Sequence, residues 1–141
     1  MTVTIRLTKC SRIEAQSTMK RLLGKINRNV LGSKYRRYEK KLIVVPVLEG
    51  REYLDLHYHL LIENPSETAK IPLNVAIWSA WNNERKAPRH FLQNETPFIE
   101  EIDRGGWLRY VTKLRDKENF QDAIDITNLH IQKNLRVGDH Q

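Results

Sequence analysis

Two histidines separated by a single residue, His57 and His59, lie in the apolar segment YLDLHYHLLIE of residues 53–63. Successive side chains of a strand point to opposite faces, so the two histidines share one face while Tyr58 and its apolar neighbours share the other. Two residues of a strand span roughly 6.5–7 Å, which lets both imidazoles reach one metal ion. The pair is therefore a candidate metal site, and a third ligand from a neighbouring strand would support it.

Three carboxylates are candidates for that third ligand. Glu49 ends the preceding apolar run, Glu52 lies in the turn, and Asp55 falls on the histidine face. Nitrogen and carboxylate ligands together suit Mn²⁺ or Mg²⁺ on an oxygen-rich substrate, and Zn²⁺ stays open. A closed structural zinc site is less favoured because thiolate ligands are missing from this segment.

A tyrosine and a lysine, Tyr110 and Lys113, lie three residues apart in GWLRYVTKLRDK, which has the pattern of a helix. Residues three apart on a helix are neighbours. Alone, such a pair is typical of an ordinary amphipathic helix. Beside a metal-bound phosphate, however, a tyrosine can attack phosphorus and form a covalent intermediate, and a lysine can stabilise the developing charge.

A basic segment, SKYRRYEKK, follows the first predicted helix and interleaves cations with Tyr35 and Tyr38. Such a mixture suits single-stranded nucleic acid, because cations meet phosphates and rings stack on bases. The whole chain has 24 Lys and Arg against 17 Asp and Glu, a net charge of +7 that favours a polyanionic partner. A solvated linker is the alternative. The candidate DNA-binding residues are Lys34, Arg36, Arg37, Lys40 and Lys41.

The elements that must position these residues follow from hydrophobic spacing, capping and turn residues. The predicted elements are a strand over 2–9, a helix from the capping box at 11–14 to Gly32, strands over 42–49 and 53–63, a helix over 71–83, a strand over 96–102 and a helix within 103–117. Pro46 removes a donor from its strand and predicts an edge position or a bulge. We expect an α+β fold with an antiparallel sheet of about five strands and packed helices, in a ferredoxin-like, RRM-like split βαβ layout.

The length of 141 residues suits one domain, residues 1–141, with one core. The longest apolar run, LIVVPVL, is too short to span a bilayer, and the first residues lack an apolar signal core. Cys10 is the single cysteine, which fits a reducing compartment. We therefore expect a cytoplasmic protein without a membrane partner.

Three motifs occur in a fixed order along the chain: TIRLTK near the start, HYH with Tyr58 in its centre, and YVTK beginning at Tyr110. This series resembles the HUH superfamily of single-strand DNA nickases, specifically its single-tyrosine replication initiators. The likeness covers roughly residues 2–117. The segments LHYHLLIE and GWLRYVTKLRDK also look like small replication-type proteins of phages, prophages and plasmids.

The resemblance implies an HUH-type nuclease domain in which His57 and His59 bind a divalent metal ion, Mn²⁺ or Mg²⁺. Tyr110 would be the nucleophile, with Lys113 assisting. The family's third ligand is a carboxylate just before the histidine strand, which Glu49 fits best, with Glu52 in reserve. A tight turn at residues 50–51 would leave Glu49 too far from His57, whereas a wider loop would bring it closer.

The activity that the resemblance implies is site-specific nicking and rejoining of single-stranded DNA through a 5′-phosphotyrosine intermediate, which initiates rolling-circle replication. The expected partner is single-stranded DNA, with a hairpin origin and a host helicase as further candidates. Two alternatives stay open: a single-tyrosine HUH transposase, and a non-catalytic nucleic-acid-binding module on the same sheet. Lys113 favours the initiator over the transposase.

Overall fold

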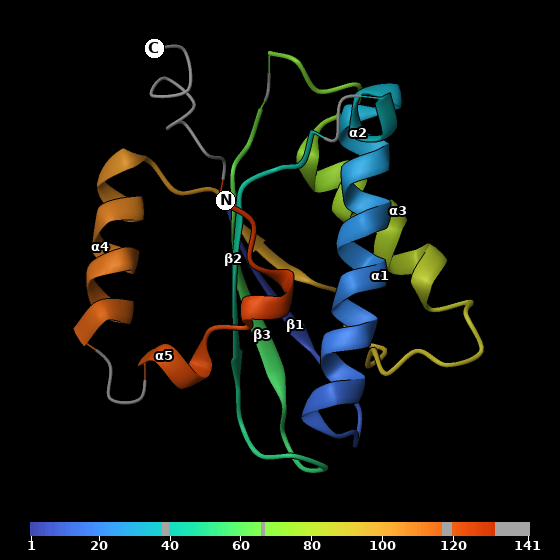
Figure 1. The fold of residues 1–141 in the computed structure, drawn as a ribbon, viewed down its shortest axis with the longest axis vertical. Coiled ribbons are helices and arrows are strands. Elements are labelled where there is room, and N and C mark those ends of the chain that lie inside the picture. The colour runs from blue at the N-terminus through green and yellow to red at the C-terminus, as the bar shows by residue number, and fades with distance from the viewer. Residues whose placement is uncertain (38–39, 66, 117–119, 132–141) are drawn as a thin grey trace.

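The computed structural model describes residues 1–37, 40–65, 67–116 and 120–131, which form an α+β fold around one antiparallel sheet (Figure 1). The sheet has four strands in this part of the chain, not about five. The region after residue 123 lies beside the outer strand but joins it through isolated bridges only, because a 3-10 helix interrupts it. The strands, in their order across the sheet, are β2 (Val44–Glu49), β3 (His57–Ile62), β1 (Thr2–Arg6) and β4 (Phe98–Glu100).

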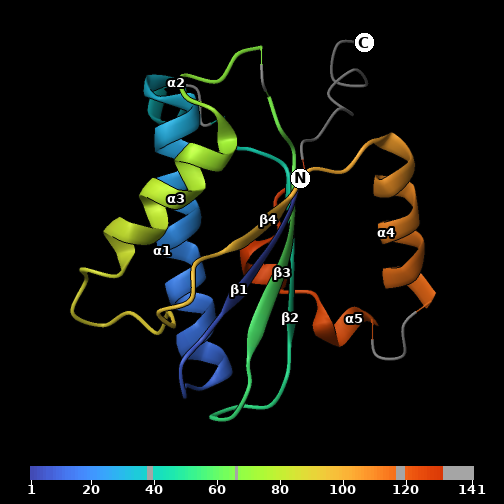
Figure 2. The same ribbon diagram turned by 180° about the vertical axis from the view of Figure 1, so that it is seen from behind.

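Helices lie on both sides of the sheet, and Figures 1 and 2 show which helix lies on which side. One side carries α1 (Arg12–Leu31), α3 (Leu73–Glu84) and the short α2 (Ser33–Arg37); the other carries α4 (Arg104–Asp116) and α5 (Phe120–Ala123). A 3-10 helix, η1 (Ile126–Asn128), completes the described elements. None of the described helices has both the length and the apolar composition that a bilayer span requires.

The first helix begins and ends where its sequence predicts. The Ser11 hydroxyl accepts from the Glu14 amide at 3.1 Å, and the Glu14 carboxylate accepts from the Ser11 amide at 3.0 Å. Gly32 ends the helix at a φ of +59°, and its amide donates to the carbonyl of Arg28. Capping at both ends satisfies backbone groups that a helix cannot pair internally. The apolar stripe between these caps packs on the sheet, burying residues that include Met19, Leu22, Ile26 and Val30.

Pro46 lies in β2 at the edge of the described sheet, as predicted. The carbonyl of Pro46 accepts from the amide of Asp125 at 2.9 Å, so it points away from β3. The amide nitrogen and carbonyl of one strand residue point to the same side, so the nitrogen of Pro46 also faces away from β3. The missing donor therefore leaves the ladder between β2 and β3 intact.

The third strand is shorter than predicted, because β3 begins at His57 and residues 50–56 form a loop. Leu54, expected on the core face, is 60% exposed. The Asp55 carboxylate accepts from the Arg51 amide at 2.6 Å, and the Asp55 amide donates to the Arg51 carbonyl at 3.1 Å. These bonds fold the segment back on itself, so it cannot extend the strand. In α4, the apolar side chain of Leu108 is exposed.

A buried carboxylate joins the histidine strand to the end of the described chain. Asp125 is fully buried, and its Oδ2 accepts from the Tyr58 hydroxyl at 2.6 Å and from the side-chain Nδ2 of Asn128 at 2.6 Å. Its Oδ1 accepts from Thr127 at 2.8 Å and from Gln16 of α1 at 3.3 Å. Burial, together with this carboxylate, raises the pKa of the Tyr58 phenol, which therefore stays a donor. The network holds β3, α1 and η1 together.

Replacing Tyr58 with phenylalanine removes one donor from this buried carboxylate. We expect Tyr58→Phe to lower the free energy of unfolding by about 1–3 kcal/mol, measured by urea denaturation. The matched control is Tyr53→Phe, whose ring is exposed and whose loss of a hydroxyl is expected to change stability by less than about 0.5 kcal/mol. Equal stability of the two variants would contradict the role given to Asp125.

Candidate metal centre

Three potential ligands, Glu49, His57 and His59, meet on one face of the sheet. Glu49 and His57 are direct partners at the end of the ladder between β2 and β3, and His59 lies two residues further along β3. One ligand atom from each residue lies within 4.8 Å of the other two, and all three side chains are half-buried. Of the three candidate carboxylates, the structure thus brings Glu49 to the histidines.

The distances suit a single small cation. Two atoms that each bind one ion at about 2.1 Å are at most about 4.2 Å apart. The carboxylate Oε1 of Glu49 lies 3.6 Å from Nε2 of His59, which is already within this limit. All three ligand atoms lie within 4.8 Å of one another, which is close to this limit. Because the three side chains are only half-buried, the cluster is accessible to solvent.

A backbone carbonyl fixes the orientation of His57. Its Nδ1 lies 2.9 Å from the carbonyl oxygen of Asp55. A carbonyl can only accept, so this bond assigns the proton to Nδ1 and leaves the lone pair on Nε2. Metal-binding histidines are commonly held in this way through their second nitrogen. His57 is therefore oriented for ligation before any ion binds.

His59 is held by its neighbours on two strands. Its Nδ1 lies 3.2 Å from the hydroxyl of Thr4, and its ring meets that of His57 edge to face at 4.9 Å between centroids. Burial, followed by the charges of His57 and Arg6, lowers the pKa of His59. The neutral imidazole that results is the form that binds metal ions.

The loop between β2 and β3 sets the register that brings Glu49 opposite His57. Gly50 has a φ of +97°, and a Cβ at this position would lie 2.3 Å from the carbonyl oxygen of Asp55. That carbonyl is the one that accepts from His57. The loop is wide enough for Glu49 to lie opposite His57, whereas a tight turn at residues 50–51 would have left the two side chains too far apart. The Asp55 carboxylate stabilises the loop by accepting a hydrogen bond from the Arg51 amide, and this bond is the main cause of the lowered pKa of Asp55.

Glu52, the reserve ligand, lies elsewhere. Its carboxylate accepts from the amide of Arg12 at 2.8 Å, at the start of α1. A carboxylate at a helix N-terminus satisfies a backbone donor and interacts favourably with the helix dipole. The structure therefore gives Glu52 a different partner and does not place it in the cluster of Glu49, His57 and His59.

Tyr110 and Lys113 both lie in α4, on the side of the sheet opposite α1 (Figures 1 and 2). The histidines occupy the same side, because Tyr58 between them packs into the core with α1. α5 contacts both α4 and β2, which carries Glu49. Lys113 is exposed, and the side chain of Tyr110 lies outside the described part of the structure. The helix that carries the predicted nucleophile thus lies on the same side of the sheet as the metal cluster. Contact between the Tyr110 phenol and a phosphate at this cluster stays a prediction.

The basic segment lies at the far end of the molecule from the metal cluster. The loop of residues 50–56 contacts the start of α1, where the Tyr53 amide donates to the Cys10 carbonyl. The 20 residues of α1 span about 30 Å, and α2 follows their end. Lys34, Arg36, Lys40 and Lys41 are exposed there, and the side chain of Arg37 lies outside the described part. The structure does not bring the predicted DNA-binding residues to the metal cluster.

Two residues of β1 that sequence reasoning missed also belong to the site. Thr4 contacts His59, and Arg6 is the strand partner of His57. Arg6 pairs with Glu95 at 3.4 Å, with both side chains largely exposed. The alternation of β1 carries the signal for both, because Thr4 and Arg6 fall on the polar face of that strand. The sequence alone does not reveal the strand register that places Thr4 and Arg6 beside the histidines.

The choice between Glu49 and Glu52 can be tested by metal titration. We expect Glu49→Gln to weaken Mn²⁺ binding at least about tenfold, because it removes a charged ligand, as measured by calorimetry. Glu52→Gln, three residues away in the chain, is expected to leave Mn²⁺ affinity unchanged. The reverse pattern, with Glu52→Gln alone weakening binding, would show that the wrong carboxylate has been assigned.

Gly50 supplies a second test of the same centre. Gly50→Ala is expected to destabilise the protein by at least about 1 kcal/mol and to weaken Mn²⁺ binding, because the new Cβ would displace the carbonyl that orients His57. The control is Gly24→Ala in α1, where the added Cβ meets only ordinary contacts and raises helix propensity. Unchanged metal affinity in Gly50→Ala would rule out the loop as a positioning element.

Comparison of the chain with protein-family models, with curated proteins and with solved structures finds no match. The resemblance to HUH nickases therefore rests on the motifs around His57, His59 and Tyr110. The candidate metal centre rests on the geometry of Glu49, His57 and His59.

Proposed function

We propose that this chain is a metal-dependent endonuclease and strand transferase that nicks single-stranded DNA with Tyr110 as nucleophile. The observation that carries the proposal is the convergence of Glu49, His57 and His59 on the side of the sheet where α4 lies. Of the three resemblance motifs, YVTK therefore lies in the helix on the side of the sheet to which the two histidines of HYH point. A metal site that only stabilises the fold would not require a helix with a tyrosine and a lysine on the same side of the sheet.

The donor set fits a divalent cation that works on phosphate. Two imidazoles and one carboxylate are compatible with Mn²⁺, and the open side of the half-buried cluster suits an oxygen-rich substrate. Glu49, His57 and His59 would hold Mn²⁺ or Mg²⁺, which would neutralise phosphate charge and make phosphorus more electrophilic. Asp55 and Thr4 would keep the two imidazoles oriented through their Nδ1 atoms.

The proposed reaction exchanges one phosphoester bond for another. The phenolic oxygen of Tyr110 attacks phosphorus, losing its proton, and the bond from phosphorus to the 3′ oxygen breaks as that oxygen gains a proton. The product is a 5′-phosphotyrosine and a free 3′-hydroxyl. Lys113, one helical turn from Tyr110, would stabilise the charge that develops on phosphate. Attack by a 3′-hydroxyl on the phosphotyrosine reverses the step and rejoins the strand.

The architecture supports assignment to a ferredoxin-like layout of the HUH type. The order β1, α1, α2, β2, β3, α3, β4 and the sheet order β2-β3-β1-β4 are compatible with the proposed split βαβ arrangement, to which α2 is an addition. In the proposed role the 3′-hydroxyl primes rolling-circle replication, with a hairpin origin as substrate and a host helicase to open the duplex.

The basic segment fits this function as a contact to flanking DNA. It lies about 30 Å from the metal cluster, which corresponds to about nine base pairs of duplex. Lys34, Arg36, Arg37, Lys40 and Lys41 would thus bind phosphates away from the scissile bond. Such contacts increase affinity without taking part in the chemistry.

The test of the proposal is the covalent intermediate. Incubation with 5′-labelled and 3′-labelled single-stranded DNA and Mn²⁺ is expected to give a protein–DNA adduct on the 3′ fragment, seen on a denaturing gel. The adduct is expected to disappear in Tyr110→Phe, in His57→Ala and with EDTA, because each removes the nucleophile or the metal ion.

The matched control is Tyr53→Phe, which removes an exposed phenol at the loop beside the metal cluster and is expected to keep the adduct. An adduct that persists in Tyr110→Phe would identify a different nucleophile. Binding of Mn²⁺ and DNA by wild-type protein without any adduct would overturn the nicking proposal and favour a non-catalytic binding module.

A further inference from the structure

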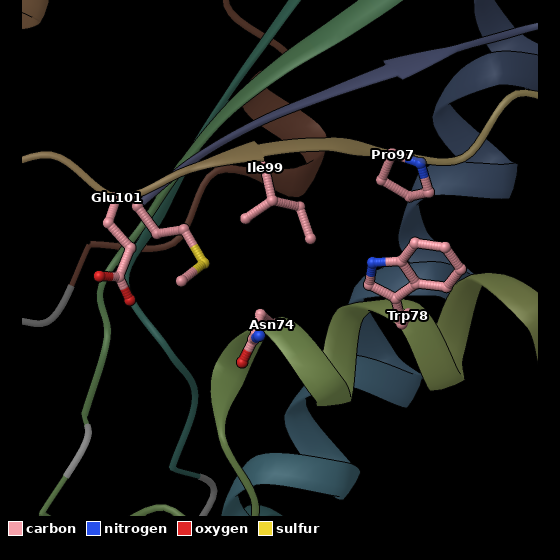
Figure 3. Close-up of a pocket in the computed structure, with 6 residues that line it drawn as sticks. Asn74, Trp78, Pro97, Ile99 and Glu101 are labelled. Atoms are coloured by element: carbon pink, nitrogen blue, oxygen red, sulfur yellow. The ribbon is translucent and has the colours of Figure 1, made fainter.

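A groove separates the edge strand β4 from α3, on the face of the sheet opposite the metal cluster. Residues at alternate positions of the β4 segment, Pro97, Ile99 and Glu101, line one wall. Asn74 and Trp78, one turn apart on α3, line the other, and the Met1 side chain completes the lining. Figure 3 shows Trp78 and Glu101 at opposite ends of the groove with Ile99 between them. The cavity has a volume of about 360 Å³.

The groove stays open because α3 packs against α1 instead of β4. The buried side of α3, which includes Ala76, Ile77 and Trp81, faces the core. Trp78 lies on another side of the helix and is 43% exposed. Its ring meets the buried ring of Trp81 at 6.2 Å between centroids. This contact holds the indole in place without covering it.

We infer that this groove binds a guanine base of single-stranded DNA, an inference that rests on the proposed function. The indole of Trp78 borders the groove with its nitrogen-bearing edge turned toward Ile99 and Asn74 (Figure 3), and together with Pro97 and Ile99 it supplies apolar contacts for a planar ring. The volume lies at the lower end of the range for small-molecule sites and accommodates one purine. The polar groups of the lining, Asn74 and Glu101, can meet the edge of the base.

Glu101 selects among the bases by its chemistry. A carboxylate only accepts hydrogen bonds, and the Watson–Crick edge of guanine presents two adjacent donors, N1–H and N2–H. The corresponding edges of adenine, cytosine and thymine each set a donor beside an acceptor.

The groove is connected to the metal centre through β4. Phe98, between Pro97 and Ile99, points to the opposite face and is 63% exposed. It pairs with Thr4, which pairs with His59, so Phe98 and His59 lie in one row about 10 Å apart. A DNA strand that crosses from the metal centre over β1 thus meets Phe98 at the sheet edge. The groove lies on the other face of that edge.

The experiment measures binding without cleavage, by fluorescence anisotropy in EDTA. The probes are labelled dT12 and dT12 carrying one central dG or one central deoxyinosine, which lacks the 2-amino donor. Wild-type protein is expected to bind the dG probe at least about fivefold more tightly than dT12, with deoxyinosine between them. Glu101→Gln is expected to abolish the preference for dG, and Trp78→Ala to weaken binding of all three probes.

Neighbouring residues that do not line the groove provide matched controls. Glu100→Gln on the other face of β4 and Val75→Ala on α3 are expected to keep wild-type affinities and preference. Equal binding of the three probes, no binding, or an undiminished dG preference in Glu101→Gln would overturn the inference. So would Glu101-dependent binding of an arginine peptide in place of DNA. Because no metal or cleavage is involved, an absent covalent adduct would count against nicking and leave this result unaffected.

Discussion

The hydrogen bond from the buried Tyr58 phenol to Asp125 is the constraint on which the site depends. A carboxylate without partners is very costly to bury, so Asp125 requires its donors from β3, α1 and η1 together. Tyr58 lies between the two histidines of one pleated strand. Fixing its ring on the core face therefore fixes both imidazoles on the opposite face. The same network secures the chain just after α4 and α5, the helices that lie on the histidine side of the sheet.

The candidate metal centre is built from the hydrogen-bonded ladder between β2 and β3 and from the loop that joins these two strands. Glu49 pairs directly with His57 because of the register between β2 and β3. The loop of residues 50–56 sets this register through the turn at Gly50. Backbone and hydroxyl partners then orient each imidazole through Nδ1. Positioning by strands and backbone groups holds the three potential ligands together, as the proposed phosphate chemistry requires.

Hydrophobic periodicity predicted the histidine face and the α+β class, the pattern from Ser11 to Glu14 and Gly32 predicted the caps of α1, and Pro46 predicted an edge position or a bulge, of which the structure has the edge position. Periodicity could not predict that the segment from Tyr53 to Leu56 leaves the strand, because alternation there is as regular as in His57–Ile62. Hydrogen bonds between Arg51 and Asp55 decide that difference. The resemblance favoured Glu49 over Glu52 as the third ligand, and the same loop explains why the structure brings Glu49 to the histidines. The role of Asp125 was hidden because its partners Gln16 and Tyr58 are far apart in the chain.

The proposed chemistry requires that an ion bound by Glu49, His57 and His59 lies close to the phenol of Tyr110. The most direct measurement is ¹⁹F NMR of protein labelled with 3-fluorotyrosine, titrated with Mn²⁺, with the resonance of residue 110 assigned through Tyr110→Phe. We expect Mn²⁺ to broaden this resonance beyond detection and His57→Ala to prevent the broadening. A sharp resonance of residue 110 in protein saturated with Mn²⁺ would show that the phenol lies far from the ion.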